Sequence, residues 1–127
     1  MDERSVAVTI GGQQHELLLT TRATKEITRR YGGLEGLGDK FMKSENLEAA
    51  LGEVVWLLVL LSNQSISVHN LLHPEAAKPL LTEEAVELLT SPLDLADYKN
   101  AIGEAVSKGV VRNITSEDEE TKNTKAG

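Results

Sequence analysis

Two histidines are the first candidates for chemistry in this sequence. His69 and His73 are four residues apart, a spacing that puts both imidazoles on one face of a helix, where they could bind a metal ion. Pro74 follows directly and disfavours helical backbone at His73, and no third ligand has a suitable spacing. We therefore predict polar histidines, exposed or partly buried, and neither a metal site nor a cofactor.

Glycines are dense between residues 32 and 38, as they are in phosphate-binding loops. Such loops follow a strand and end in Gly-Lys-Ser or Gly-Lys-Thr. This segment follows a predicted helix and has no such ending. We interpret it as a flexible connection between two helices.

Catalytic nucleophiles have no recognisable partners here. Serines and carboxylates are plentiful, but no pattern combines a nucleophile, a base and an orienting group. The chain has no cysteine, which excludes a thiol nucleophile and a thiolate zinc site and fits a reducing cytoplasm. We predict that the protein is not an enzyme.

A row of basic residues stands out in this acidic chain. Its members recur at helical spacing, and we call them the basic strip: Arg22, Lys25, Arg29 and Arg30. The simpler interpretation is a solvated helix face. The alternative is a docking face for an acidic partner or another copy of the chain, where opposite charge would steer association.

Composition limits the remaining functions. The 127 residues fit one domain, and the net charge of −7 opposes binding to nucleic acid or to an anionic membrane surface. The N-terminus has no apolar stretch typical of a signal peptide. Residues 54–61 are eight consecutive apolar residues, too few for the roughly 20 that span a bilayer. We predict a buried core helix there, covered on every side.

The elements that position these residues follow from the patterning. Alternating apolar residues on either side of Gly11-Gly12 predict a β-hairpin over residues 5–19 that lies against helices. Thr20 or Thr21 caps a helix that ends at Gly32. A short helix packing Leu37 and Phe41 follows, and then a central helix over residues 45–63. Residues 64–81 contain two prolines and are the least regular stretch.

The C-terminal third predicts two more helices. They cover residues 82–89 and 92–109, with Ser91 as the cap of the second. We predict a short edge strand over residues 110–114. The polar composition of residues 115–127 predicts a disordered tail. The expected fold is α+β and mostly α: an N-terminal hairpin, then four to five helices, in one domain over residues 1–114.

The first third of the chain resembles the tail assembly chaperones of long-tailed bacteriophages. Their hairpin with an Ile-x-Gly pattern matches residues 8–19, and it leads into a helix with a recurring motif. That motif maps to Arg22, Ala23, Lys25, Glu26, Ile27, Tyr31, Gly32 and Gly33. The resemblance is best over about the first third of the chain; beyond it only the helical character is shared.

The resemblance implies a non-enzymatic role in the host bacterial cytoplasm. Such chaperones coat the tape-measure protein, keep it soluble, help to recruit tail-tube subunits and are absent from the virion. Further copies of the chain are another candidate partner, and neither nucleic acid nor a membrane is implied. Many such genes also make a longer form by frameshifting, for which a polar tail would serve as a linker.

Two alternatives stay open at this point. The chain could be a structural or completion subunit of the tail or head that is retained in the virion, or it could belong to a third class, a small regulatory domain or an enzyme. A candidate contact surface in the irregular stretch consists of Ile66, Val68, Leu71 and Leu72. These four residues either close the core or, if exposed together, form an apolar patch for a partner.

Overall fold

The hairpin forms as the alternation predicts. The computed structural model describes residues 4–37 and 47–126, and of residues 111–126 it describes only the helical backbone. Strand β1 (Val6–Ile10) pairs antiparallel with β2 (Gln13–Leu17) in a register that puts Val6 opposite Leu17. Gly11 and Gly12 both have positive φ, 58° and 82°, as a tight primed turn requires. Val8, Ile10 and Leu17 are buried on one face.

Helix α1 (Thr21–Tyr31) has the predicted cap at each end. The Thr20 hydroxyl accepts a hydrogen bond from the Ala23 amide at 3.0 Å. Gly32 is left-handed, with φ 81°, and its amide donates to the Thr28 carbonyl at 2.8 Å. A further helical turn follows at residues 34–37, where Leu37 is buried as expected; Phe41 lies outside the described residues.

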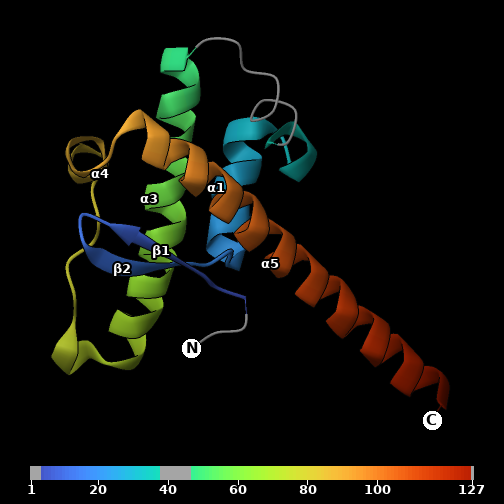
Figure 1. The fold of residues 1–127 in the computed structure, drawn as a ribbon. Helices are drawn as coiled ribbons and strands as arrows, with labels where there is room; N and C mark the ends of the chain where they lie inside the picture. Colours follow the sequence, from blue (N-terminus) through green and yellow to red (C-terminus); the bar gives the residue numbers. More distant parts are fainter. Residues whose placement is uncertain (1–3, 38–46, 127) are drawn as a thin grey trace.

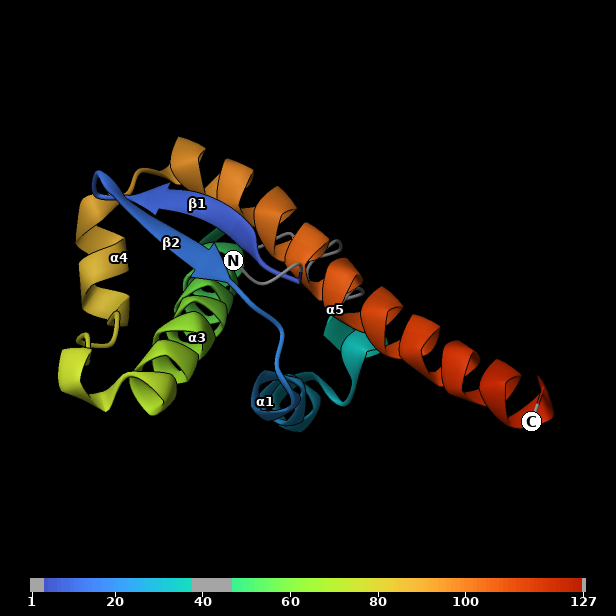
Figure 2. The ribbon, with the colours of Figure 1, turned by 90° about the horizontal axis from the view of Figure 1, so that it is seen from below.

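Helix α3 (Leu47–Leu72) is the centre of the structure. It contacts β2, α1, α4, α5 and the 3-10 helix η1 (Pro74–Ala76). Figures 1 and 2 show it enclosed between the hairpin, α1, α4 and α5. All eight residues of the apolar run at 54–61 are buried or partly buried, which confirms the core-helix prediction. The expected end near Asn63 is wrong, because neither Gly nor Pro occurs between Gln64 and Leu72 to stop the helix.

Two asparagines on α3 hold the backbone of residues 78–81, part of the stretch that the sequence predicts to be irregular. Asn63 donates to the Leu81 carbonyl at 2.9 Å and accepts from the Leu81 amide at 2.7 Å. Asn70 makes the same pair of bonds with Lys78, at 2.9 and 2.8 Å. The backbone of this stretch therefore has side-chain partners on α3, which satisfies polar groups that no sheet or helix serves.

The last two helices pack against different parts of the structure, α4 on α3 and α5 on the hairpin and α3. Helix α4 (Glu83–Leu89) is capped by the Thr82 hydroxyl and buries Val86. Helix α5 (Pro92–Ala126) lies along β1, and Tyr98 donates a hydrogen bond to the Thr9 carbonyl at 2.5 Å. Its buried residues follow helical spacing on one face: Leu95, Tyr98, Ile102 and Ala105.

Helix α5 does not end at Gly109. A Cβ on Gly109 would lie 2.7 Å from the Leu19 Cδ2 atom, so this glycine permits close packing instead of stopping the helix. The helix continues to Ala126 because residues 110–126 contain neither Gly nor Pro. The strand predicted at residues 110–114 is therefore wrong, and the structure has a helix at residues 115–126, where we predicted disorder. Gly52 faces open space, so it marks no close approach of another backbone.

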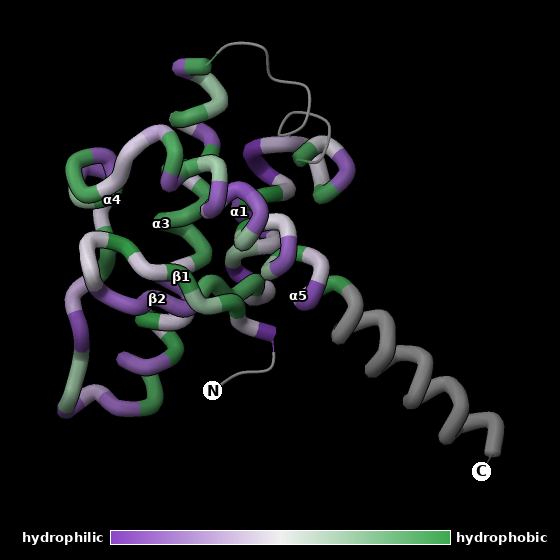
Figure 3. Tube along the Cα trace, in the orientation of Figure 1, coloured by the Kyte–Doolittle hydropathy of each residue, from purple (hydrophilic) through white to green (hydrophobic). Residues whose placement is uncertain are grey.

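The architecture confirms the predicted α+β class. A two-stranded hairpin precedes helices that make up most of the described residues. The core lies where α3, the hairpin and α5 meet, and hydrophobic segments gather there in Figure 3. The far end of α5 extends away from this core (Figure 1). The predicted domain boundary at residue 114 stays a prediction.

By length and composition alone, α3 could also cross a membrane, with a mean hydropathy of 1.5 over its most apolar window. A core helix passes the same test. Leu57, Leu58 and Leu61 are completely buried against the rest of this chain, and Trp56, Val59 and Leu60 are partly buried. We therefore interpret α3 as a core helix.

Replacing a central leucine of α3 tests its role as the core. We expect Leu58→Ala to lower the free energy of unfolding by about 2–5 kcal/mol, because the side chain is fully buried and would leave a cavity. Leu47→Ala is the control: Leu47 is on the same helix but 69% exposed, so its loss should cost less than about 0.5 kcal/mol. Urea unfolding followed by circular dichroism measures both. Equal losses would contradict a core centred on Leu58.

Candidate functional site

The histidine pair has a structural role at the end of α3. The two rings lie 5.2 Å apart. The Nε2 atom of His69 makes a hydrogen bond with the Ala76 carbonyl at 2.9 Å, and His73, beyond the helix end, lies 3.7 Å from a Glu75 carboxylate oxygen. Among the described residues no group of three His, Asp or Glu is close enough to hold a metal ion. His69 thus helps to close the turn into η1.

Three members of the basic strip form one exposed row on α1. Arg22, Lys25 and Arg29 are all exposed, and only Arg29 has an ion pair among the described residues, with Glu26 at 2.8 Å. Exposed ion pairs of this kind contribute little to stability. A shallow recess on the same helix is lined by Thr21, Thr24, Lys25, Thr28 and Arg29. This face offers cations and hydroxyl groups to an acidic partner.

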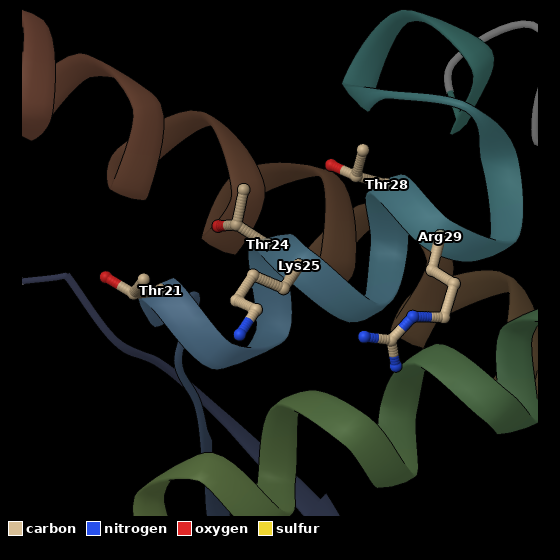
Figure 4. A pocket seen from close by; sticks show the side chains of 5 residues that line it. All are labelled: Thr21, Thr24, Lys25, Thr28 and Arg29. Atoms are coloured by element: carbon tan, nitrogen blue, oxygen red, sulfur yellow. The ribbon is translucent and has the colours of Figure 1, made fainter.

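Figure 4 shows how these side chains are arranged. Thr24 and Thr28 point to one side of α1, and Lys25 and Arg29 point to the other. The five lining residues that the structure describes all belong to α1, and the recess is open to solvent. Such a surface suits a protein contact better than a small ligand, since small-ligand sites are usually concave and largely enclosed.

Arg30 leaves the strip and joins a cluster between α1 and α3. Its guanidinium donates two hydrogen bonds to the Glu53 carboxylate, at 3.1 and 3.4 Å. It also lies 4.3 Å from the centre of the Trp56 ring. Tyr31 donates to Glu53 as well and packs edge-on against Trp56, with ring centres 6.0 Å apart. The prediction that Arg30 belongs to a docking face is therefore not supported by its position.

This cluster explains part of the helix motif. Tyr31 and Arg30 bring the end of α1 to Glu53, whose side chain is only 14% exposed. Burial raises the pKa of the Tyr31 phenol, and the hydrogen bond with Glu53 raises it further, while Arg30 acts more weakly in the opposite direction. The phenol therefore stays protonated and continues to donate to the carboxylate. Sequence reasoning missed Glu53, because no periodicity links it to residues more than 20 positions earlier.

The predicted apolar patch is divided by the structure. Val68, Leu71 and Leu72 follow helical spacing on one face at the end of α3 and are 39%, 81% and 66% exposed. Ile66 is partly buried and points to another side of the helix. Three of the four residues are thus available to a partner in the described structure, and partner binding itself stays a prediction.

More exposed leucines lie close behind in the sequence. Among the described residues, eight large hydrophobic side chains are exposed, and seven of them fall between Val68 and Leu93. Those that our sequence analysis did not select are Leu80, Leu88, Leu89 and Leu93. The signal in the sequence that points to them is an excess of leucines over the few positions that a short helix such as α4 can bury.

Comparison with known proteins adds no relative. No family model matches the chain, and no curated protein or solved structure matches it either.

The Tyr31 cluster predicts a specific dependence of stability on pH. The pKa of Tyr31 is higher in the folded protein than the ordinary value of about 10 in an unfolded chain. The unfolded state therefore loses its proton first, so stability is complete below about pH 10 and falls as the pH rises above it. We expect Tyr31→Phe to weaken this fall and to cost about 1–2 kcal/mol at pH 7.

Urea unfolding between pH 7 and 11 measures this effect. Tyr98→Phe is the matched control, because the pKa of Tyr98 is also raised, chiefly by burial, without a Glu53 contact. The other titrating groups are common to both variants. An unchanged pH dependence in Tyr31→Phe would contradict the proposed coupling between Tyr31 and Glu53.

Proposed function

We propose that this protein is a tail assembly chaperone of a long-tailed bacteriophage. In this role it binds the tape-measure protein in the host bacterial cytoplasm, keeps it soluble and helps tail-tube subunits to assemble around it. The proposal begins from the resemblance of residues 8–33 to these chaperones. The local structure is compatible with that resemblance: Ala23 and Ile27 are buried, Tyr31 contacts α3 and Gly32 caps the helix.

One observation carries the proposal. Seven large hydrophobic side chains between Val68 and Leu93 are exposed at 39–82% on a chain with net charge −7. Exposed apolar surface of this kind marks protein-binding sites, and the net charge opposes non-specific aggregation. A chaperone for a long helical partner needs both properties.

Co-expression tests the proposal directly. We expect the tape-measure protein encoded in the same genome to stay in the soluble fraction when this chain is co-expressed, because the chain covers its apolar helical surface. An unrelated acidic protein of similar size is the control. If the tape-measure protein precipitates equally with and without this chain, the proposal is wrong. Retention of the chain in purified particles would also contradict it and would favour a structural subunit.

Charge reversal on α1 tests the basic strip. Replacing Arg22, Lys25 and Arg29 by Glu should leave helicity nearly unchanged, since all three are exposed. If these residues dock on an acidic partner, association should weaken and lose its salt dependence. Pull-down and sedimentation at two salt concentrations measure the effect.

A control with the same change in net charge replaces Lys108, Lys122 and Lys125 by Glu, three lysines that lie outside α1 and outside residues 68–97. If the two triple variants associate equally well with the partner, the basic residues of α1 are only a solvated helix face.

A further inference from the structure

One segment of the chain contains six of the exposed leucines. The segment from Val68 to Leu93 comprises the end of α3, η1, the stretch held by Asn63 and Asn70, α4 and the start of α5. In both ribbon views it lies on the side away from the far end of α5 (Figures 1 and 2). We call its six exposed leucines the leucine flank: Leu71, Leu72, Leu80, Leu88, Leu89 and Leu93.

The leucine flank is held in place by the rest of the structure. The hydrogen bonds from Asn63 and Asn70 fix the backbone on either side of Leu80. The side chain of Leu89 lies over the hairpin turn, 2.9 Å from the position of a Cβ on Gly11. Helix α4 is anchored by Val86, which is completely buried. The leucines are therefore presented by ordered elements, which lowers the entropy lost when a partner binds.

Acidic residues dominate this segment and the four residues that follow it. Residues 68–97 contain six carboxylates and a single lysine, Lys78. The carboxylates are Glu75, Glu83, Glu84, Glu87, Asp94 and Asp97. All but Asp94 belong to exposed residues, and Asp94 is partly exposed. A partner that covers the leucines must therefore place positive charge next to its own apolar surface.

The charges also argue against two other occupants. A second copy that met this flank with its own flank would bring the two sets of carboxylates together, which is unfavourable. The basic face of α1 on another copy supplies the right charge, but its exposed neighbours are threonines and it has no apolar stripe. An anionic membrane surface would be repelled.

We propose that the leucine flank is the docking site for an amphipathic helix whose apolar stripe is bordered by Lys and Arg. The inference rests on the proposed function for the identity of the biological partner, which would be a basic helical stretch of the tape-measure protein. The surface itself is argued only from exposure and charge. Such a helix would bury the leucines and pair its cations with the surrounding carboxylates.

Synthetic peptides test the charge requirement. The probe is a labelled helix of about five turns with a leucine stripe bordered by lysines, and its counterpart replaces every lysine by glutamate. We expect the full-length protein to bind the lysine peptide at least about tenfold more tightly at low salt, with the difference shrinking as salt rises. Fluorescence anisotropy measures both affinities. Equal binding of the two peptides, or preference for the glutamate peptide, would overturn the proposal.

Leucine variants test the surface. Leu71→Ser, Leu88→Ser and Leu93→Ser change side chains that are 81%, 77% and 82% exposed, so the fold should be retained. We expect the triple variant to bind the lysine peptide about tenfold or more weakly. Leu47→Ser is the matched control, at 69% exposure outside the flank, and should bind as the unmodified chain does. If Leu47→Ser weakens binding of the lysine peptide as much as the triple variant does, the leucine flank is not the binding site.

A charge swap gives an independent readout. Glu87→Lys together with Asp97→Lys should shift preference toward the glutamate peptide, which a merely structural role of these residues would not do. Sedimentation of the unmodified chain completes the test: a dimer that the flank variants abolish and that excludes the peptide would overturn the proposal in favour of self-association. Binding to anionic vesicles through the flank would overturn it as well.

The inference and the proposed function can fail separately. Peptide binding through the flank without solubilisation of the tape-measure protein would leave the docking surface intact and remove the chaperone role. Solubilisation that the flank variants do not reduce would leave the chaperone role intact and remove the docking surface.

Discussion

Burial of α3 is the constraint on which the rest of the structure depends. A helix that is apolar all round has to be covered all round. In a chain of 127 residues, this cover requires most of the other helices and strands. The hairpin, α1, α4 and α5 each lie against it. Burial of residues such as Leu57, Leu58 and Leu61 contributes roughly 1.5–3 kcal/mol each, so this burial dominates the energetics and leaves the outer surface comparatively free to vary.

Polar contacts determine how the covering elements are placed. Apolar packing has little directional preference, whereas the bonds from Asn63 to Leu81 and from Tyr98 to Thr9 each have one geometry. Ser65 likewise donates to the Glu16 carbonyl at 2.7 Å and fixes β2 on α3. Each satisfies a partly buried backbone group that would otherwise be costly. The apolar run thus provides the driving force, and a few long-range hydrogen bonds specify the arrangement.

The sequence predicts local features well and long-range ones poorly. The Gly11-Gly12 turn and the Thr20 cap follow from chemistry within a few residues, and both were predicted. The predicted end of α3 is wrong because the two prolines of residues 64–81 lie beyond Leu72 and do not end the helix earlier. Gln64 is buried within it and accepts a hydrogen bond from Thr20, 44 residues away in sequence. Gly109 was misread because its neighbour Leu19 is 90 residues away in sequence. In the candidate site, the exposure of Leu71 and Leu72 could not be predicted. It depends on which leucines the core has room to bury, and sequence periodicity does not reveal this.

The charge of this chain and its exposed leucines have one physical explanation in common. An exposed apolar surface favours association with any similar surface, including the same surface on other copies. Six carboxylates within residues 68–97 repel the same surface on another copy. They do not repel a partner whose apolar surface is bordered by positive charge. The cations that would neutralise these carboxylates lie mainly elsewhere: Arg22, Lys25 and Arg29 are on α1, and Arg30 is bound to Glu53. In the proposed complex, the carboxylates that oppose contact between two copies would also select a partner with positive charge beside its apolar surface.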